Sequence, residues 1–181
     1  MKAVATTLIA SASFVAFLSG CASSGIGMTP SVPEKLKVPA TETLSVVAQA
    51  AGVQIYECNA GKTDPTLFEW AFKAPEAELF NNAGKKIGKH YAGPTWESDD
   101  GSKVIGEVKA LDDGPDASAI PWLLLSAKSV EGNGIFAKTQ SIQRVKTVGG
   151  KAPVDGCNQA QSGKVARVAY RATYNFYVSK P

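Results

Sequence analysis

The sequence predicts an all-β fold: a single antiparallel β-barrel or β-sandwich of about seven or eight strands, with little helix. Apolar and polar residues alternate along most of the chain beyond residue 50. Turn residues interrupt this alternation about every ten residues. Long helices do not alternate with the strands, as a parallel sheet would require. The pattern does not distinguish a barrel from a sandwich.

The C-terminal segment gives the clearest strand pattern. One face carries the apolar residues Val168, Tyr170, Ala172, Tyr174, Phe176 and Val178. The opposite face carries Arg167, Arg171, Thr173 and Asn175. A period of two over this length is typical of a long, half-buried strand and does not fit a helix.

Shorter runs and turn residues predict the other elements in order. The predicted strands lie near residues 53–58, 66–73, 78–81, 86–92, 103–111, 121–130, 135–147 and 166–178. Turns rich in Asn, Asp and Gly are expected at 81–84, 99–101 and 131–134. Two segments have alternatives: residues 74–80 as one helical turn, and residues 41–51 as a short helix or a lead-in to the first strand.

The N-terminus predicts export and lipid attachment. Lys2 precedes an apolar run at residues 3–17, and the following Leu18-Ser19-Gly20-Cys21 has the form of a bacterial lipobox. We expect residues 1–20 to be a lipoprotein signal peptide and the Cys21 thiol to carry lipid; the alternative is an ordinary secretory signal. The membrane is then a partner through this lipid. Because Ala22 rather than aspartate follows Cys21, we expect the bacterial cell envelope, at the outer membrane facing the periplasm.

The rest of the chain divides into a linker and one domain. Residues 21–40 contain the expected lipidated cysteine and are rich in Ser, Gly and Pro, which predicts a flexible tether. Residues 41–181 are predicted to form a β-rich globular domain. The formal net charge is +3 and no arginine-rich run is present, so nucleic acid is not an expected partner.

Two of the three cysteines remain if Cys21 is acylated, namely Cys58 and Cys157. An oxidising compartment favours a disulfide between them. The alternatives are two free thiols or a metal site. Neither a CxxC nor an HxxxH spacing accompanies these cysteines, so we expect no metal.

The densest group of functional side chains lies at residues 88–97. Tyr91 and Trp96 are expected to stack on a ligand, with His90 and Glu97 as polar anchors and Trp122 as a cavity wall. The alternative is that the aromatic residues belong to the core and the polar ones cap a turn. Together these are the candidate ligand-binding residues.

Catalysis has weaker support than binding. The sequence has no GxSxG, HExxH, P-loop or GxGxxG motif, and we expect no cofactor. A carboxylate-dependent hydrolase using Glu97 with Asp99 or Asp100 is one alternative. A basic group, made of Lys85, Lys86, Lys89, Arg144 and Lys146, is interpreted as a contact for anionic lipid head groups or as a solvated face.

Several segments resemble an uncharacterised bacterial and fungal family, the domain-of-unknown-function family numbered 3455. These segments are residues 52–58, 90–97, 120–125, 141–145, 147–150 and 152–153, Cys157, and the tyrosine-rich residues 170–177. The resemblance covers about residues 34–178 and implies a secreted β-rich domain without an established activity. We therefore expect a non-enzymatic protein that binds a small ligand or an envelope component. The alternative is a structural lipoprotein that docks onto a partner.

Overall fold

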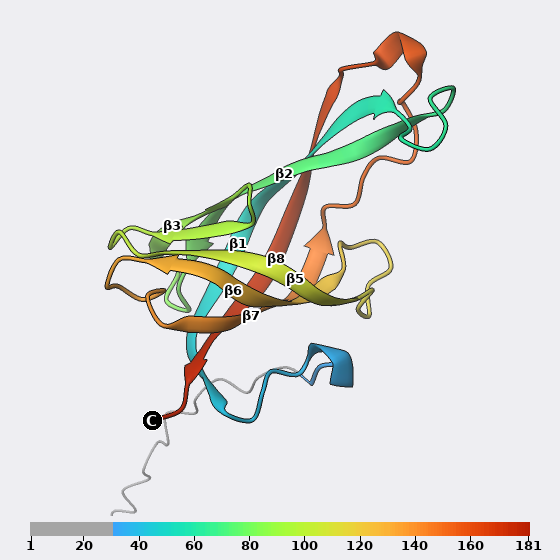
Figure 1. The fold of residues 1–181 in the computed structure, drawn as a ribbon. Coiled ribbons are helices and arrows are strands. Elements are labelled where there is room, and N and C mark those ends of the chain that lie inside the picture. The colour runs from blue at the N-terminus through green and yellow to red at the C-terminus, as the bar shows by residue number, and fades with distance from the viewer. Residues whose placement is uncertain (1–30) are drawn as a thin grey trace, which may run out of the picture.

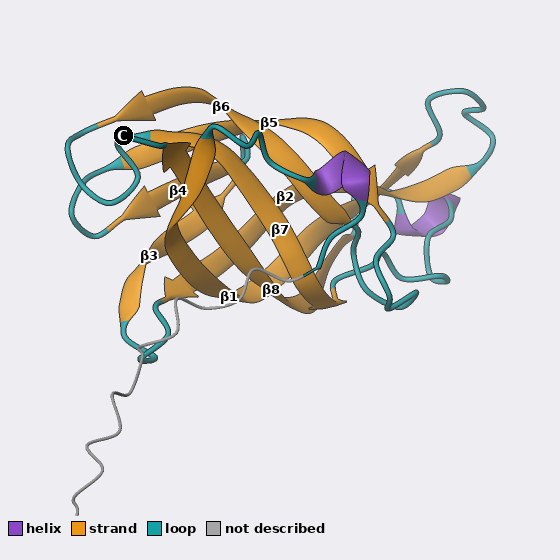
Figure 2. Ribbon diagram, turned by 90° about the horizontal axis from the view of Figure 1, so that it is seen from below, coloured by secondary structure: helices purple, strands orange, loops and turns teal. Residues whose placement is uncertain are grey.

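The computed structural model describes residues 31–181 and confirms the all-β prediction (Figures 1 and 2). Eight antiparallel strands pair in sequence order, and the last pairs with the first, so the sheet is a closed barrel. The strands are β1 (Glu42–Ala60), β2 (Phe68–Phe80), β3 (Lys86–Tyr91), β4 (Thr95–Ser98), β5 (Lys103–Asp112), β6 (Trp122–Glu131), β7 (Thr139–Gly149) and β8 (Val165–Ser179). Two short 3₁₀ helices are η1 (Glu34–Leu36) and η2 (Gln159–Gln161). Within the described residues, no helix is long and apolar enough to cross a membrane.

Several predicted elements need correction at their ends. Residues 41–51 are not a helix, because they form the first half of the 19-residue β1. Residues 74–80 are neither a helical turn nor the start of a separate strand, because β2 continues along β1 to Phe80. Strand β4 was not predicted, and β7 begins at Thr139 rather than at 135.

The barrel interior holds the main hydrophobic core. The apolar face predicted for the last strand is confirmed, since Tyr170, Ala172, Tyr174 and Phe176 of β8 are all buried in that core. The strand is not half-buried throughout, because Thr173 and Asn175 on its opposite face are buried as well. The core also contains Leu79, Trp96, Val104, Leu125, Phe136 and Ile142. At Gly106 a Cβ atom would lie 2.9 Å from the Trp96 ring, so glycine in β5 gives the indole the room it needs.

The segment preceding β1 packs onto the outside of the barrel (Figure 2). Leu36 is fully buried against Trp122 and Val145. Its carbonyl accepts a 2.7 Å hydrogen bond from the Gln143 amide, which in turn accepts one of 2.7 Å from the Tyr177 hydroxyl. We call residues 32–37 the N-terminal strap. The strap lies within the predicted tether, and its residues pack on the barrel.

Residues 1–30 lie outside the described part of the chain. The predicted signal peptide, the lipid on Cys21 and the first half of the predicted tether all fall there. They stay predictions.

An arm projects beyond the barrel where β1, β2 and β8 extend past their neighbours (Figure 1). We define this projecting arm as residues 57–70 and 151–166. The predicted disulfide is confirmed: Cys58 of β1 is bonded to Cys157, 99 positions along the chain. The Trp70 indole also donates a 3.0 Å hydrogen bond to the Asp155 carbonyl, so the long connection before β8 is held to the arm twice.

We predict that the double substitution Cys58→Ser and Cys157→Ser lowers the free energy of unfolding by about 2–5 kcal/mol, because the bond closes a long loop. Urea denaturation followed by circular dichroism measures this change. Reducing the wild-type protein with a thiol is the matched control and should cause the same loss. A loss below about 0.5 kcal/mol in both would show that the arm needs no covalent constraint.

Candidate functional site

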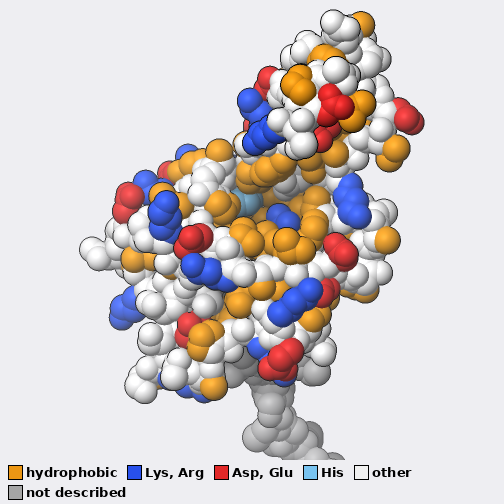
Figure 3. Space-filling view, turned by 45° about the vertical axis from the view of Figure 1, so that its right-hand side comes forward, with side chains coloured by type: hydrophobic (Ala, Val, Ile, Leu, Met, Phe, Trp, Pro, Cys, Tyr) orange, Lys and Arg blue, Asp and Glu red, His pale blue; other side chains and the backbone are white. Residues whose placement is uncertain are grey.

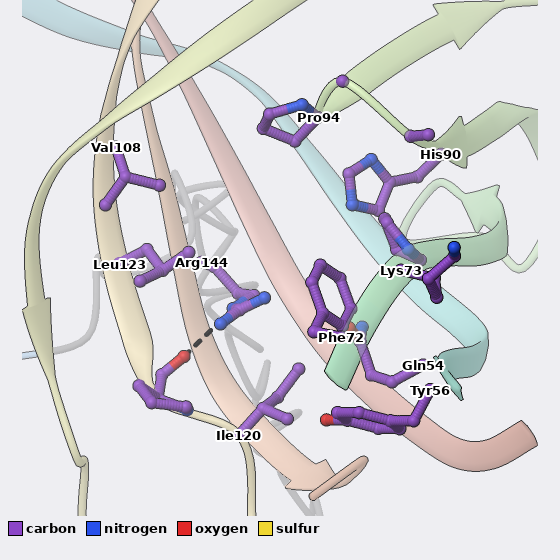
Figure 4. Close-up of a pocket in the computed structure, with 14 residues that line it drawn as sticks. Gln54, Tyr56, Phe72, Lys73, His90, Pro94, Val108, Ile120, Leu123 and Arg144 are labelled. Atoms are coloured by element: carbon purple, nitrogen blue, oxygen red, sulfur yellow. Dashed lines mark hydrogen bonds between the residues drawn. The ribbon is translucent and has the colours of Figure 1, made fainter. Parts of the chain in front are cut away.

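The barrel interior opens into a pocket of about 370 Å³ on the side facing the arm (Figure 3). Strands β1, β2, β3, β5, β6 and β7 contribute side chains to it. Apolar walls come from Tyr56, Phe72, Pro75, Val108, Ile120 and Leu123 (Figure 4). Hydrophobic atoms surround the hollow in the space-filling view, and the histidine is visible inside it. This size lies within the range of small-molecule sites.

The β3–β4 turn leaves space on one side of the pocket. Ala92, Gly93 and Pro94 line it there, and the first two carry little or no side chain. The neighbouring part of the barrel is filled instead, by the rings of Trp96, Tyr174 and Phe176. The pocket therefore lies at one end of a packed core.

His90 forms the boundary between core and pocket. Its ring stacks on Trp96 with centroids 4.5 Å apart, and only 2% of the residue is exposed. The ring Nδ1 lies 2.8 Å from the Thr95 carbonyl, which can only accept, so Nδ1 carries the proton and Nε2 is an acceptor. Burial lowers the pKa of His90 to about 3, so the imidazole is neutral near pH 7.

Arg144 of β7 brings a positive charge into the pocket. Its Nε donates a 3.0 Å hydrogen bond to the Pro121 carbonyl (Figure 4). None of the ion pairs formed by residues 31–181 involves this guanidinium. Lys73, which also lines the pocket, is paired with Glu57 at 2.8 Å. Arg144 is thus the pocket's cation without a counterion in the described chain.

One buried polar residue that lines the pocket is also unsatisfied. Gln54 lines the pocket and is 2% exposed, yet its Nε2 has no hydrogen-bond partner among the described residues. The Tyr170 and Tyr174 hydroxyls are not part of the pocket lining; they interact with each other, and that of Tyr174 also with Arg144. Burial raises the pKa of both tyrosines, and the nearby Arg144 lowers it to a lesser degree. Both hydroxyls therefore stay protonated and can donate.

The five predicted ligand-binding residues do not form one site, because strand alternation separates them. His90 lines the pocket, and Trp96 lies behind it in the core. Tyr91 and Glu97 face the outside of the barrel, where the tyrosine hydroxyl donates a 2.6 Å hydrogen bond to the carboxylate. Trp122 packs under the N-terminal strap. Tyr91 and Trp96 therefore cannot stack on one ligand.

Two of the three carboxylates of the hydrolase alternative, Glu97 and Asp100, have structural partners. Glu97 also pairs with Lys89 at 3.3 Å, and the hydrogen bond from Tyr91 is the main cause that lowers its pKa. Asp100 accepts hydrogen bonds from Ser102 and from the Ile135 backbone, and these bonds lower its pKa to about 2. The residues that line the pocket include no Asp or Glu within the described chain. This geometry argues against a carboxylate-dependent hydrolase in the pocket.

Arg144 and Gln54 were not predicted as site residues. The sequence placed Arg144 on a basic surface with Lys146, but the two side chains lie in different environments, Arg144 in the pocket and Lys146 exposed. The register of β7 shifts between Val145 and Val148, which ends the simple alternation. A glutamine in an otherwise apolar strand segment was the available signal for Gln54.

We predict that stability falls by about 2 kcal/mol between pH 7 and pH 5 because of His90. The unfolded imidazole binds a proton as the pH falls through its ordinary value of 6.5, whereas the folded one does so only near pH 3. Stability is therefore lost as the pH falls through this range. Urea titrations of wild type and His90→Gln measure the effect. An equal loss in both proteins would contradict the assignment to His90.

Comparison with known proteins supports the resemblance seen in the sequence. A family model described as "Protein of unknown function (DUF3455)" matches residues 39–178, which is most of the chain. The comparison with curated proteins gave no match, and neither did that with solved structures. The extent of the family match leads to one conclusion: the chain belongs to the DUF3455 family.

Proposed function

We propose that this protein binds a small, largely apolar ligand in the barrel pocket, as a lipid-anchored protein of the bacterial cell envelope. The observation that carries the binding proposal is the open, apolar pocket of about 370 Å³ beside a well-packed core. Protein interiors are close-packed, so an accessible space of this size is a departure from the rule. Ligand pockets commonly combine such apolar walls with a few polar groups.

Exposed apolar side chains at the pocket support this proposal. Phe72 is 55% exposed and Val108 is 47% exposed, and both line the pocket. Covering apolar surface gains about 25 cal/mol for each Å² removed from water. A bound apolar group would therefore be stabilised by contact with these two side chains.

The envelope location comes from the sequence. The lipobox at Cys21 would attach the chain to a membrane, and Ala22 favours the outer membrane. Residues between Cys21 and the N-terminal strap would then set the distance from the lipid to the barrel. The Cys58–Cys157 bond agrees with an oxidising compartment such as the periplasm.

A second candidate function is docking onto a partner protein of the envelope. The projecting arm exposes three large apolar residues: Leu67 at 64%, Val154 at 97% and Val165 at 53%. Exposed apolar side chains of this kind can mark protein interaction sites. This function uses the arm rather than the pocket, so substitutions separate the two.

The neutral apolar dye N-phenyl-1-naphthylamine tests pocket binding. We expect one molecule to bind per chain with increased fluorescence. Val108→Glu should weaken binding at least tenfold, because a carboxylate then replaces part of the apolar wall. Val154→Glu is the matched control, since it makes the same change on the arm. The affinity of the Val154→Glu protein for the dye should equal that of the wild-type protein.

Thermal unfolding gives an independent readout of the same complex. A ligand at about 100 times its dissociation constant adds roughly 2.7 kcal/mol, which corresponds to about 5–10 °C for a chain of this size. Absence of dye binding to the wild-type protein would reject pocket binding. Equal weakening by Val108→Glu and Val154→Glu would place the dye elsewhere and favour the docking function.

A further inference from the structure

Arg144 is a half-buried cation that nothing in the described chain neutralises. Taking a charge out of water costs free energy unless a partner compensates it. The other cation of the same pocket, Lys73, has such a partner, since Glu57 pairs with it at 2.8 Å. The fold therefore keeps one positive charge in the pocket at a cost to stability, which is typical of a functional group.

The pocket also holds an unsatisfied donor. The Gln54 amide nitrogen is buried without a partner among residues 31–181, whereas the Tyr170 and Tyr174 hydroxyls interact with each other, and that of Tyr174 also with Arg144. A buried donor without an acceptor costs free energy comparable to a lost hydrogen bond. A cation and an unpartnered donor in one pocket form a favourable environment for an oxyanion.

The charge count distinguishes between oxyanions. One unpaired guanidinium balances the single negative charge of a carboxylate but not the two charges of a phosphate monoester. The Nε of Arg144 is already used by the Pro121 carbonyl. The guanidinium still carries its positive charge, and a guanidinium fork matches the geometry of a carboxylate.

The other residues of the pocket indicate what kind of group is attached to the carboxylate. Phe72, Val108, Ile120 and Leu123 form apolar walls around the charged group. The pocket volume of about 370 Å³ lies within the range of small-molecule sites and leaves room for an apolar group attached to the carboxylate.

We propose that the pocket binds an apolar monocarboxylate, such as a medium-chain fatty acid, with its carboxylate on Arg144 and its tail against the apolar walls. This inference rests on the proposed function, because it names the class of ligand for the same pocket. Gln54 supplies a further donor to the carboxylate.

Displacement of bound N-phenyl-1-naphthylamine by four eight-carbon compounds tests the proposal. They are octanoate, 1-octanol, octylammonium and octyl phosphate, which share a tail and differ in the head group. We expect octanoate to bind about 10- to 100-fold more tightly than 1-octanol, as for a charge-assisted hydrogen-bonded pair. Octylammonium should bind least, and octyl phosphate no more tightly than octanoate.

Arg144→Met should reduce the advantage of octanoate over 1-octanol to within about twofold while the dye still binds. Arg171→Met is the matched control, since it removes an exposed arginine elsewhere on the barrel. It should leave the octanoate advantage unchanged. Dye binding to Arg144→Met shows that the pocket is folded, and Arg144→Lys should retain part of the advantage because the charge remains.

The outcomes separate this inference from the function on which it rests. If the dye binds but octanoate and 1-octanol displace it equally, the carboxylate assignment is wrong and pocket binding stands. If octyl phosphate binds at least tenfold more tightly than octanoate, the head group is a phosphate and the assignment is also overturned. If the dye does not bind to the wild-type protein, the proposed function itself fails.

Discussion

Pairing between β1 and β8 closes the barrel, and the positions of the functional side chains follow from this closure. The two strands pair from Glu42 with Ser179 to Glu57 with Val165. A closed sheet has one inside and one outside, so each residue of a strand is assigned to one of them by alternation. This constraint places His90 in the interior and its neighbour Tyr91 on the outer surface.

Side chains fill only part of the barrel interior, and polar residues lie in the part that stays open as the pocket. Trp96 and Phe176 occupy the packed part of the barrel, whereas Gln54 and Arg144 line the pocket. A barrel optimised for stability alone would place apolar side chains at such positions. Retaining a charge and an unpartnered amide there lowers stability, and recognition of a ligand with a complementary head group would explain why they are kept.

Local sequence patterns predicted the fold class, the long β8 strand and the disulfide, but of the residues that line the pocket they singled out only His90 as a ligand contact. The alternation in β8 was readable because one face is apolar and the other is largely polar. In β7 the same alternation is obscured, since the N-terminal strap covers Gln143 and Val145 on the outer face. Arg144 consequently had the pattern of a surface residue. The first half of β1 was equally hard to predict, because its stability as a strand comes from pairing with β8, more than 100 residues away.

In this proposal the barrel interior recognises a carboxylate through Arg144. Nuclear magnetic resonance tests it most directly, by following the side-chain N–H signals of ¹⁵N-labelled protein during a titration with octanoate. We expect saturable shifts of the Arg144 Nε–H and Gln54 amide signals, with the signals of the projecting arm unchanged. Shifts confined to the arm near Leu67 and Val154 would contradict it and place the binding surface outside the barrel.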